Sequence, residues 1–153
     1  MYRERINLSE NKSVLVDIAD GVLNLKSNQL NCSELAVILN TIPKDILSSI
    51  IKLHLGNNQL TTLPAEIGRL QNLEELLLEG NELTTLPAEI VRLQNLEELL
   101  LSENQLTTLP AEIWQLQNLE GLYLDFNQLT TLPAEIGQLH NLQLLFLSNN
   151  RLT

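Results

Sequence analysis

The fold is decided by residues 70–92, which read LQNLEELLLEGNELTTLPAEIVR. The chain repeats them almost unchanged at residues 93–115, as LQNLEELLLSENQLTTLPAEIWQ. Outward from this pair, apolar residues recur every 23 positions, at Ile50, Leu73, Leu96, Leu119 and Leu142. Repeats of roughly 20–50 residues are typical of solenoids, in which each copy forms one supersecondary unit. The sequence therefore predicts a stack of similar units.

The first half of each unit has the pattern of a short β-strand followed by a turn. Leu76 and Leu78 lie two residues apart, so a strand would point both to one face and Leu77 to the other. Asn81 follows at the predicted strand end, where its amide can bond to free backbone groups in the turn. Stacking would align the corresponding asparagines, which are Asn28, Asn58, Asn81, Asn104, Asn127 and Asn150. We expect them to form a hydrogen-bonded ladder with a structural role.

The second half of each unit predicts a short helix. Pro64 suits the first helical position, because the N–H that proline lacks would have no partner there. Glu66 would lie in the first turn, which the helix dipole favours, and Ile67 and Leu70 return to the core at helical spacing. We expect Trp114 to pack against the adjacent helix on this side. Each unit is then strand, turn, short helix and turn, and stacked units share one continuous core.

The pattern L-x-x-L-x-L-x-x-N-x-L and the phrase LTTLPAEIGRLQNL at residues 60–73 resemble the leucine-rich-repeat family. The resemblance is to the bacterial type with 23-residue repeats, as found in secreted or effector proteins of pathogens. It implies an α/β fold, a right-handed leucine-rich-repeat solenoid or horseshoe, with a concave parallel β-sheet and short convex helices.

The N-terminal third departs from the 23-residue spacing. Leu23 and Leu53 are 30 residues apart, and the extra length predicts an α-helix capped by Ser33 that ends near Pro43. This unit resembles the ribonuclease-inhibitor-like class of repeat. The expected parts of the chain are an N-terminal cap (residues 1–19), a longer helical repeat (20–49), and four complete 23-residue repeats plus the strand half of a fifth (50–153).

Both ends of the chain depart from the regular unit. Near the start, Ile6, Leu8 and Asn11 match part of a unit. The chain stops at Leu152 and Thr153, directly after the strand half of a unit, and an uncapped solenoid exposes apolar residues and a strand edge. We expect a fragment of a longer protein or a compact natural end, in a monomer. The alternative is end-to-end contact with another chain through the uncapped C-terminus.

The composition limits the classes of partner. A formal net charge of −10 repels phosphate backbones and anionic lipid, so we expect neither nucleic acid nor membrane as partner. No stretch approaches the roughly 20 apolar residues of a membrane span, and the start MYRERINLSENK lacks the apolar core of a signal peptide. The single cysteine, Cys32, fits a reducing compartment. With the family resemblance, these features predict a soluble protein of the bacterial cytoplasm or one delivered into a host cell.

The sequence lacks the patterns of catalytic and metal-binding sites. His54 and His140 lie in different repeats and at different positions of the unit, without the spacing of metal ligands. Consecutive acids such as Glu97 and Glu98 would be split between two faces of a strand. We therefore expect no enzyme activity, no cofactor and no metal. Glu75 would stack on Glu98, giving an acidic face that is either merely solvated or an electrostatic landing site.

The residues that vary between copies lie beside the strand leucines, on the predicted concave face. The central column reads Asn24, His54, Leu77, Leu100, Tyr123 and Phe146. The side chains from Leu77 onward have no core to fill there, and aromatic anchors with a charged rim are typical of protein interfaces. The alternative is that neighbours cover the rings, which then only stabilise the sheet. The predicted partner site comprises Glu75, Leu77, Glu79, Glu98, Leu100, Glu103, Tyr123, Asp125, Phe126 and Phe146.

These observations leave competing functions. The first is a protein-interaction module that binds, on its concave face, a partner protein or peptide with a basic and apolar surface. The resemblance extends this to a bacterial effector acting on host proteins. The second is the substrate-recognition fragment of a larger enzyme, since such repeats precede a ubiquitin-ligase domain in some bacterial effectors. A third, an engineered consensus scaffold, agrees with the uniform repeats but not with the irregular N-terminal third.

Overall fold

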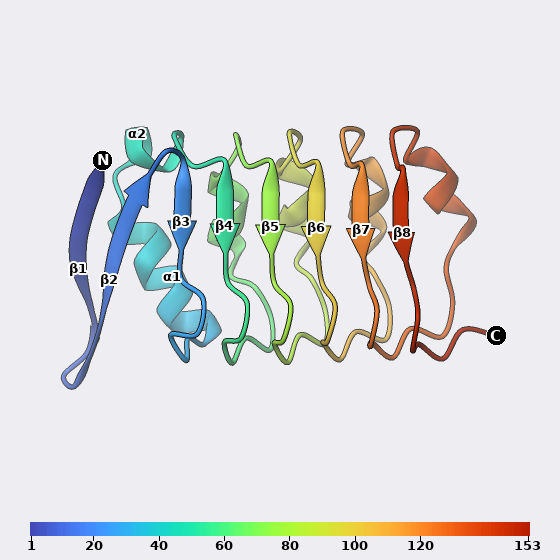
Figure 1. Cartoon of the computed structure of the whole chain (residues 1–153), viewed down its shortest axis with the longest axis horizontal. Helices are drawn as coiled ribbons and strands as arrows, with labels where there is room; N and C mark the ends of the chain where they lie inside the picture. The colour runs from blue at the N-terminus through green and yellow to red at the C-terminus, as the bar shows by residue number, and fades with distance from the viewer.

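The computed structural model describes all 153 residues, which form one open eight-stranded sheet with helices along one side (Figure 1). The strands, in chain order across the sheet, are β1 (Tyr2–Ser9), β2 (Lys12–Ala19), β3 (Val22–Asn24), β4 (Lys52–His54), β5 (Glu75–Leu77), β6 (Glu98–Leu100), β7 (Gly121–Tyr123) and β8 (Leu144–Phe146). The helices are α1 (Cys32–Thr41), α2 (Lys44–Leu47) and the 3-10 helices η1 (Ala65–Arg69), η2 (Ala88–Arg92), η3 (Ala111–Gln115) and η4 (Ala134–Gln138). None of the helices is long and apolar enough to cross a membrane.

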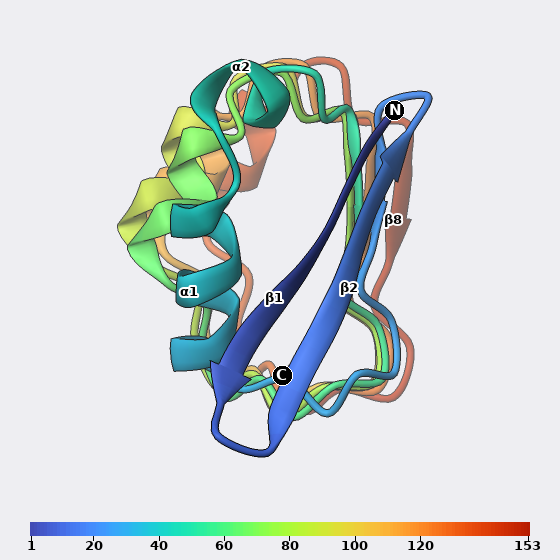
Figure 2. The same ribbon diagram turned by 90° about the vertical axis from the view of Figure 1, so that its left-hand side faces the viewer.

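Strands β3 to β8 are short and pair in parallel, which confirms the predicted parallel sheet. Their register is the one that the repeat spacing predicts, because the central leucines Leu53, Leu76, Leu99 and Leu122 lie on adjacent strands. Seen from the end of the stack, each coil runs from the sheet to a helix on the opposite side and back (Figure 2). The chain is therefore a solenoid whose sheet forms one whole side.

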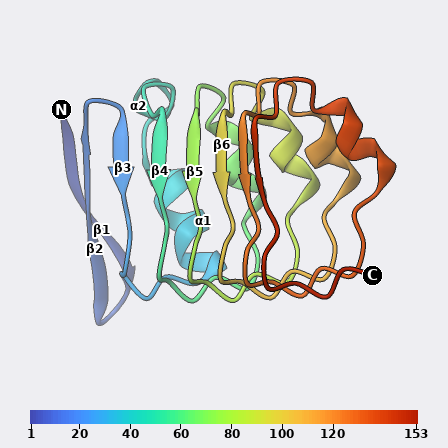
Figure 3. The same ribbon diagram turned by 45° about the vertical axis from the view of Figure 1, so that its right-hand side comes forward.

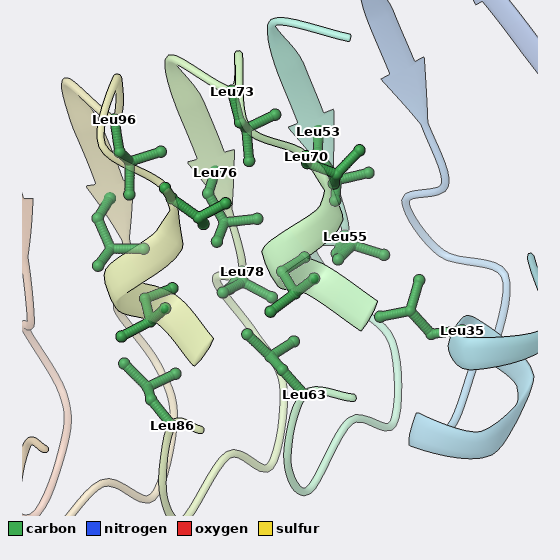
Figure 4. Packing of buried hydrophobic residues seen from close by; sticks show 14 of the residues in the cluster. Leu35, Leu53, Leu55, Leu63, Leu70, Leu73, Leu76, Leu78, Leu86 and Leu96 are labelled. Atoms are coloured by element: carbon green, nitrogen blue, oxygen red, sulfur yellow. The ribbon is translucent and has the colours of Figure 1, made fainter. Parts of the chain in front are cut away.

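The core fills the inside of the coil. Leu76 and Leu78 enter it from the strand side, while Leu70 and Leu73 enter it from the segment that follows η1 (Figure 4). All four side chains are fully buried, and the buried apolar residues of the chain form one continuous cluster. No single unit encloses its own core, so each depends on its neighbours for stability.

The short helices differ from the prediction in two respects. They are five-residue 3-10 helices, and each proline precedes its helix with an extended backbone instead of occupying the first helical position. Pro64, for example, has ψ 152°. A 3-10 helix rises faster per residue than an α-helix, so it spans the short distance available with few residues. Trp114, expected to pack on this side, is 2% exposed and belongs to the core cluster.

The longer helix α1 is present where predicted, but its cap is Asn31 and not Ser33. The Asn31 Oδ1 accepts a hydrogen bond from the Glu34 N–H at 3.0 Å, and the Glu34 carboxylate accepts one from the Asn31 N–H at 3.0 Å. This reciprocal pair satisfies two backbone donors, which a cap at Ser33 would leave free. The helix ends at Thr41, before the extended residue Ile42 that precedes Pro43.

The N-terminal segment is a β-hairpin, so the interpretation of Ile6, Leu8 and Asn11 as part of a repeat is wrong. Strand β1 pairs with β2 in antiparallel fashion, with Ile6 opposite Val14, and β2 then pairs antiparallel with β3. Side chains that alternate along β2 are buried, as a half-covered strand requires. The hairpin lies across the open end of the coil (Figure 2). We propose that residues 1–19 cap the first layer of the core.

The asparagine ladder is confirmed in five of its six members. Asn81 donates to the backbone oxygens of Leu55 and Leu78, each at 3.0 Å, and accepts from the Leu60 N–H at 3.1 Å. The same three bonds recur at Asn58, Asn104, Asn127 and Asn150. The exception is Asn28, whose side chain donates to the nearby Lys26 oxygen. The ladder fixes the turn after each strand, and these turns border the candidate site.

Candidate functional site

The face of the sheet turned away from the helices, called the concave face below, carries the residues that differ between repeats. In β5, Leu76 points into the core, so its neighbours Glu75 and Leu77 point to the concave face and are half-buried. The register aligns Leu77 with Leu100, Tyr123 and Phe146 on successive strands. Parallel pairing thus brings the predicted central column together.

Four predicted site residues lie beyond the strands, since each strand is only three residues long. Glu79, Glu103, Asp125 and Phe126 follow the strand ends and belong to the turns, so strand alternation does not orient them. Instead, the third residue after the end of each of these strands has a left-handed backbone conformation. The φ values are 58° at Ser27, 53° at Asn57, 68° at Gly80, 58° at Glu103, 55° at Phe126 and 57° at Asn149.

The two stacked acids of the face turn away from each other. Glu75 forms an ion pair with Lys52 on one neighbouring strand. Glu98 leans the other way, over Gly121, where a Cβ atom would overlap its carboxylate. Burial raises the pKa of Tyr123, and the negative charge of the nearby Glu98 raises it further. The repulsion expected between Glu75 and Glu98 is therefore relieved by a cation on one side and a glycine on the other.

The C-terminal end of the concave face is apolar and exposed. The rings of Tyr123 and Phe146 are stacked, with centroids 5.0 Å apart and planes 11° from parallel. Phe126 is 56% exposed, Leu144 44% and Phe146 43%. We call Tyr123 of β7, Leu144 and Phe146 of β8, and Phe126 in the turn after β7 the aromatic patch. The sequence prediction missed Leu144. The sequence does indicate it, because Leu144 occupies the repeat position that is acidic in β5 and β6, at Glu75 and Glu98.

The N-terminal end of the face is polar and centred on His54. Burial lowers the pKa of the His54 imidazole, and the Lys52 and Lys26 charges lower it further, against opposing contributions from Glu79 and Glu75. The His54 Nε2 atom is buried and has no hydrogen-bond partner. The neutral imidazole is the form that this environment favours.

We expect acid to destabilise the fold through His54. Its pKa is lower in the folded chain than the ordinary value of about 6.5, so the unfolded chain binds more protons between these two values. The contribution of His54 to stability is complete above about pH 6.5 and is lost as the pH falls through the folded pKa. Urea unfolding between pH 7.5 and 5.5 should show this loss of stability. The variant His54→Asn, which introduces the residue type found at Asn24 in the same column, should reduce the pH dependence. A pH dependence unchanged in the variant would contradict the assignment.

The structure contains no group of three or more His, Cys, Asp or Glu side chains that could hold a metal ion. The geometry provides a sheet that carries, on one face, a set of half-buried and exposed side chains that differ between repeats. A stacked solenoid of this kind defines a repeat scaffold of the class typically used for protein–protein interaction.

Comparison with known families agrees with this class. Two models described as leucine rich repeat match the chain, one at residues 71–129 and 94–152 and the other at residues 49–70. The chain belongs to the leucine-rich-repeat family. A sequence comparison with curated proteins finds no match.

Solved structures with the same fold include bacterial proteins. A leucine-rich-repeat protein of Leptospira interrogans is 41% identical with a TM-score of 0.73, over 86% of this chain and 32% of that one. Internalin C2 of Listeria monocytogenes is 29% identical with a TM-score of 0.70, over 87% of this chain and 54% of that one. PEPR1, in a structure with AtPEP1, is 32% identical with a TM-score of 0.67, over 86% of this chain and 18% of that one. The chain thus spans about a third of the Leptospira protein and about half of the internalin.

Proposed function

We propose that the chain binds a partner protein or peptide on its concave face, anchored by the aromatic patch. The observation that carries the proposal is Phe126. Its backbone φ of 55° is one that bulky residues rarely adopt, and its side chain is 56% exposed. Three of the five equivalent residues, Asn57, Gly80 and Asn149, are of types that tolerate this conformation, while the other two, Ser27 and Glu103, are smaller or more flexible than phenylalanine. A strained, largely exposed phenylalanine adds little to folding, which supports a role in binding.

The charges around the patch indicate the chemistry of the partner. Glu98 lies beside Tyr123, and Asp125 and Glu103 occupy the adjoining turns. A partner that places Lys or Arg next to an apolar side chain would match both features. The acids would mainly accelerate encounter and set its salt dependence, whereas the aromatic side chains would hold the complex together.

The relatives support a partner of protein nature and a bacterial source. The PEPR1 structure contains a second component, AtPEP1, and the other two relatives come from Leptospira and Listeria. We extend the proposal to a bacterial effector that acts on host proteins.

A peptide-display selection on the immobilised chain tests the proposal. Enriched peptides should combine basic and apolar residues, and Phe126→Asn should weaken their binding at least tenfold, mainly by faster dissociation. The same variant should unfold at nearly the wild-type urea concentration, because the strain released, about 1 kcal/mol, offsets the partial burial lost. Surface-immobilised kinetics at two salt concentrations measures the first effect.

The matched control is Val37→Ala, which shortens another exposed apolar side chain (41%), on helix α1 on the opposite side. It should bind the selected peptides like the wild type. Loss of binding in the Val37 variant, with normal binding by the Phe126 variant, would place the site on the helical side and refute the proposal.

A further inference from the structure

Away from the concave face, the structure has a pocket lined almost entirely by polar and basic side chains. It lies on the helical side, between α2, η1 and η2. Figure 3 shows α2 toward the N-terminal end of the stack. Its volume is about 230 Å³. The lining residues are Lys44, Leu47, Ser48, Gly68, Arg69, Gln71, Asn72 and Arg92.

The charge of the pocket is opposite to that of the chain. Three of the nine Lys and Arg residues line it, Lys44, Arg69 and Arg92, and none of the 19 acidic residues does. None of these three cations forms an ion pair, because the three ion pairs of the chain use Arg3, Lys12 and Lys52. In a chain with a net charge of −10, this is a local concentration of unneutralised positive charge.

Arg69 is held in place by the fold and still has free donors. Its Nη1 donates to the Leu39 carbonyl oxygen at 2.7 Å and to the Asn40 Oδ1 at 3.1 Å, at the C-terminal end of α1. A guanidinium has five N–H donors, so Nε and Nη2 remain available. The anchored side chain loses little conformational entropy when it binds an anion.

The basic residues are specific to this part of the stack. At the position of Arg69 and Arg92, the next two repeats have Gln115 and Gln138. The pocket also depends on Gly68, since a Cβ there would lie 2.9 Å from the Arg92 Cδ. The repeat scaffold therefore does not require this cluster, because it tolerates neutral residues at the same position elsewhere.

We propose that this pocket binds a phosphate group. Arginine forks and a lysine ammonium are the donors that recognise phosphate oxygens in proteins. The volume is below the roughly 300–1,000 Å³ of sites for drug-sized ligands, so the pocket takes a single phosphate-sized group rather than a nucleotide. The shared chemistry is a doubly charged phosphate, either free or carried as an ester on a peptide side chain.

The test is a titration of the isotope-labelled chain with inorganic phosphate at constant ionic strength, followed by backbone amide NMR. The amide chemical-shift changes should concentrate in residues 44–48, 68–72 and 92. Arg92→Gln, which introduces the residue found at Gln115, should weaken binding about tenfold. Gly68→Val, which introduces the residue found at Val91, should do the same without changing the charge. The control Arg151→Gln removes a cation outside the pocket and should leave binding unchanged.

A second arm uses a phosphoserine peptide in place of inorganic phosphate. If the peptide binds more tightly than inorganic phosphate, the natural ligand is the phosphate ester. If it binds equally or more weakly, the natural ligand is the free anion. Either result supports phosphate binding in this pocket. Shifts spread over the whole surface, or equal weakening in all three variants, would overturn the proposal. Equal binding of acetate would overturn the assignment to phosphate.

Discussion

Replacing Leu99 with alanine should lower the free energy of unfolding by about 2–5 kcal/mol. Leu99 is the central residue of β6 and is fully buried, between Leu76 of β5 and Leu122 of β7. The layers on both sides are held by backbone pairing and by the asparagine ladder, so they cannot collapse into the space that the leucine leaves. The cost therefore includes the cavity as well as the lost burial.

Leu145→Ala is the matched control, because Leu145 occupies the same repeat position in β8. Its side chain is 37% exposed, and only one neighbouring layer covers it. We expect a clearly smaller loss of stability than at Leu99. Urea unfolding of both variants measures the difference, with the slope of the transition confirming that the same unit unfolds. Equal losses would mean that another chain covers Leu145 in solution.

The strands, their parallel order and their register could be predicted because the same sequence pattern recurs in several repeats. The alternation around Leu76 and Leu99 recurs in every copy, so the core side and the concave side of each strand follow from one spacing. The predicted site residues on the strands are accordingly side by side.

Features that occur once were harder to predict. The hairpin of residues 2–19 has no repeat partner, and its short alternating stretch matches part of a repeat as well as a strand. The cap at Asn31 depends on a single reciprocal pair with Glu34. The opposite tilts of Glu75 and Glu98 depend on what the adjacent strands carry, Lys52 and Gly121, which is a tertiary property.

The ladder gives the second large effect: Asn104→Leu should destabilise the chain by about 3 kcal/mol or more. The side chain of Asn104 is 7% exposed and satisfies three buried backbone groups. Its Nδ2 donates to the oxygens of Leu78 and Leu101, each at 3.0 Å, and its Oδ1 accepts from the Leu83 N–H at 2.9 Å. Leucine has a similar size but offers no partner, and each buried unsatisfied group costs about 1–3 kcal/mol.

Asn150→Leu removes the same three hydrogen bonds, but there the backbone groups are only partly buried. Because water can replace the lost partners, the loss of stability should be much smaller than at Asn104. Urea unfolding compares the two variants, and hydrogen exchange at the Leu83 amide should accelerate only in the Asn104 variant. Equal costs would show that water reaches the inner ladder as well.

The inner ladder also bears on binding. Asn127 directly follows Phe126 and makes the corresponding three bonds, at 2.9, 3.1 and 3.0 Å. These bonds fix the turn in which Phe126 adopts its left-handed backbone, so the ladder maintains the strain at that residue. A ladder that is as costly to break as we predict at Asn104 can therefore hold an unfavourable, exposed phenylalanine in the turn after β7, where we propose that it contacts a partner.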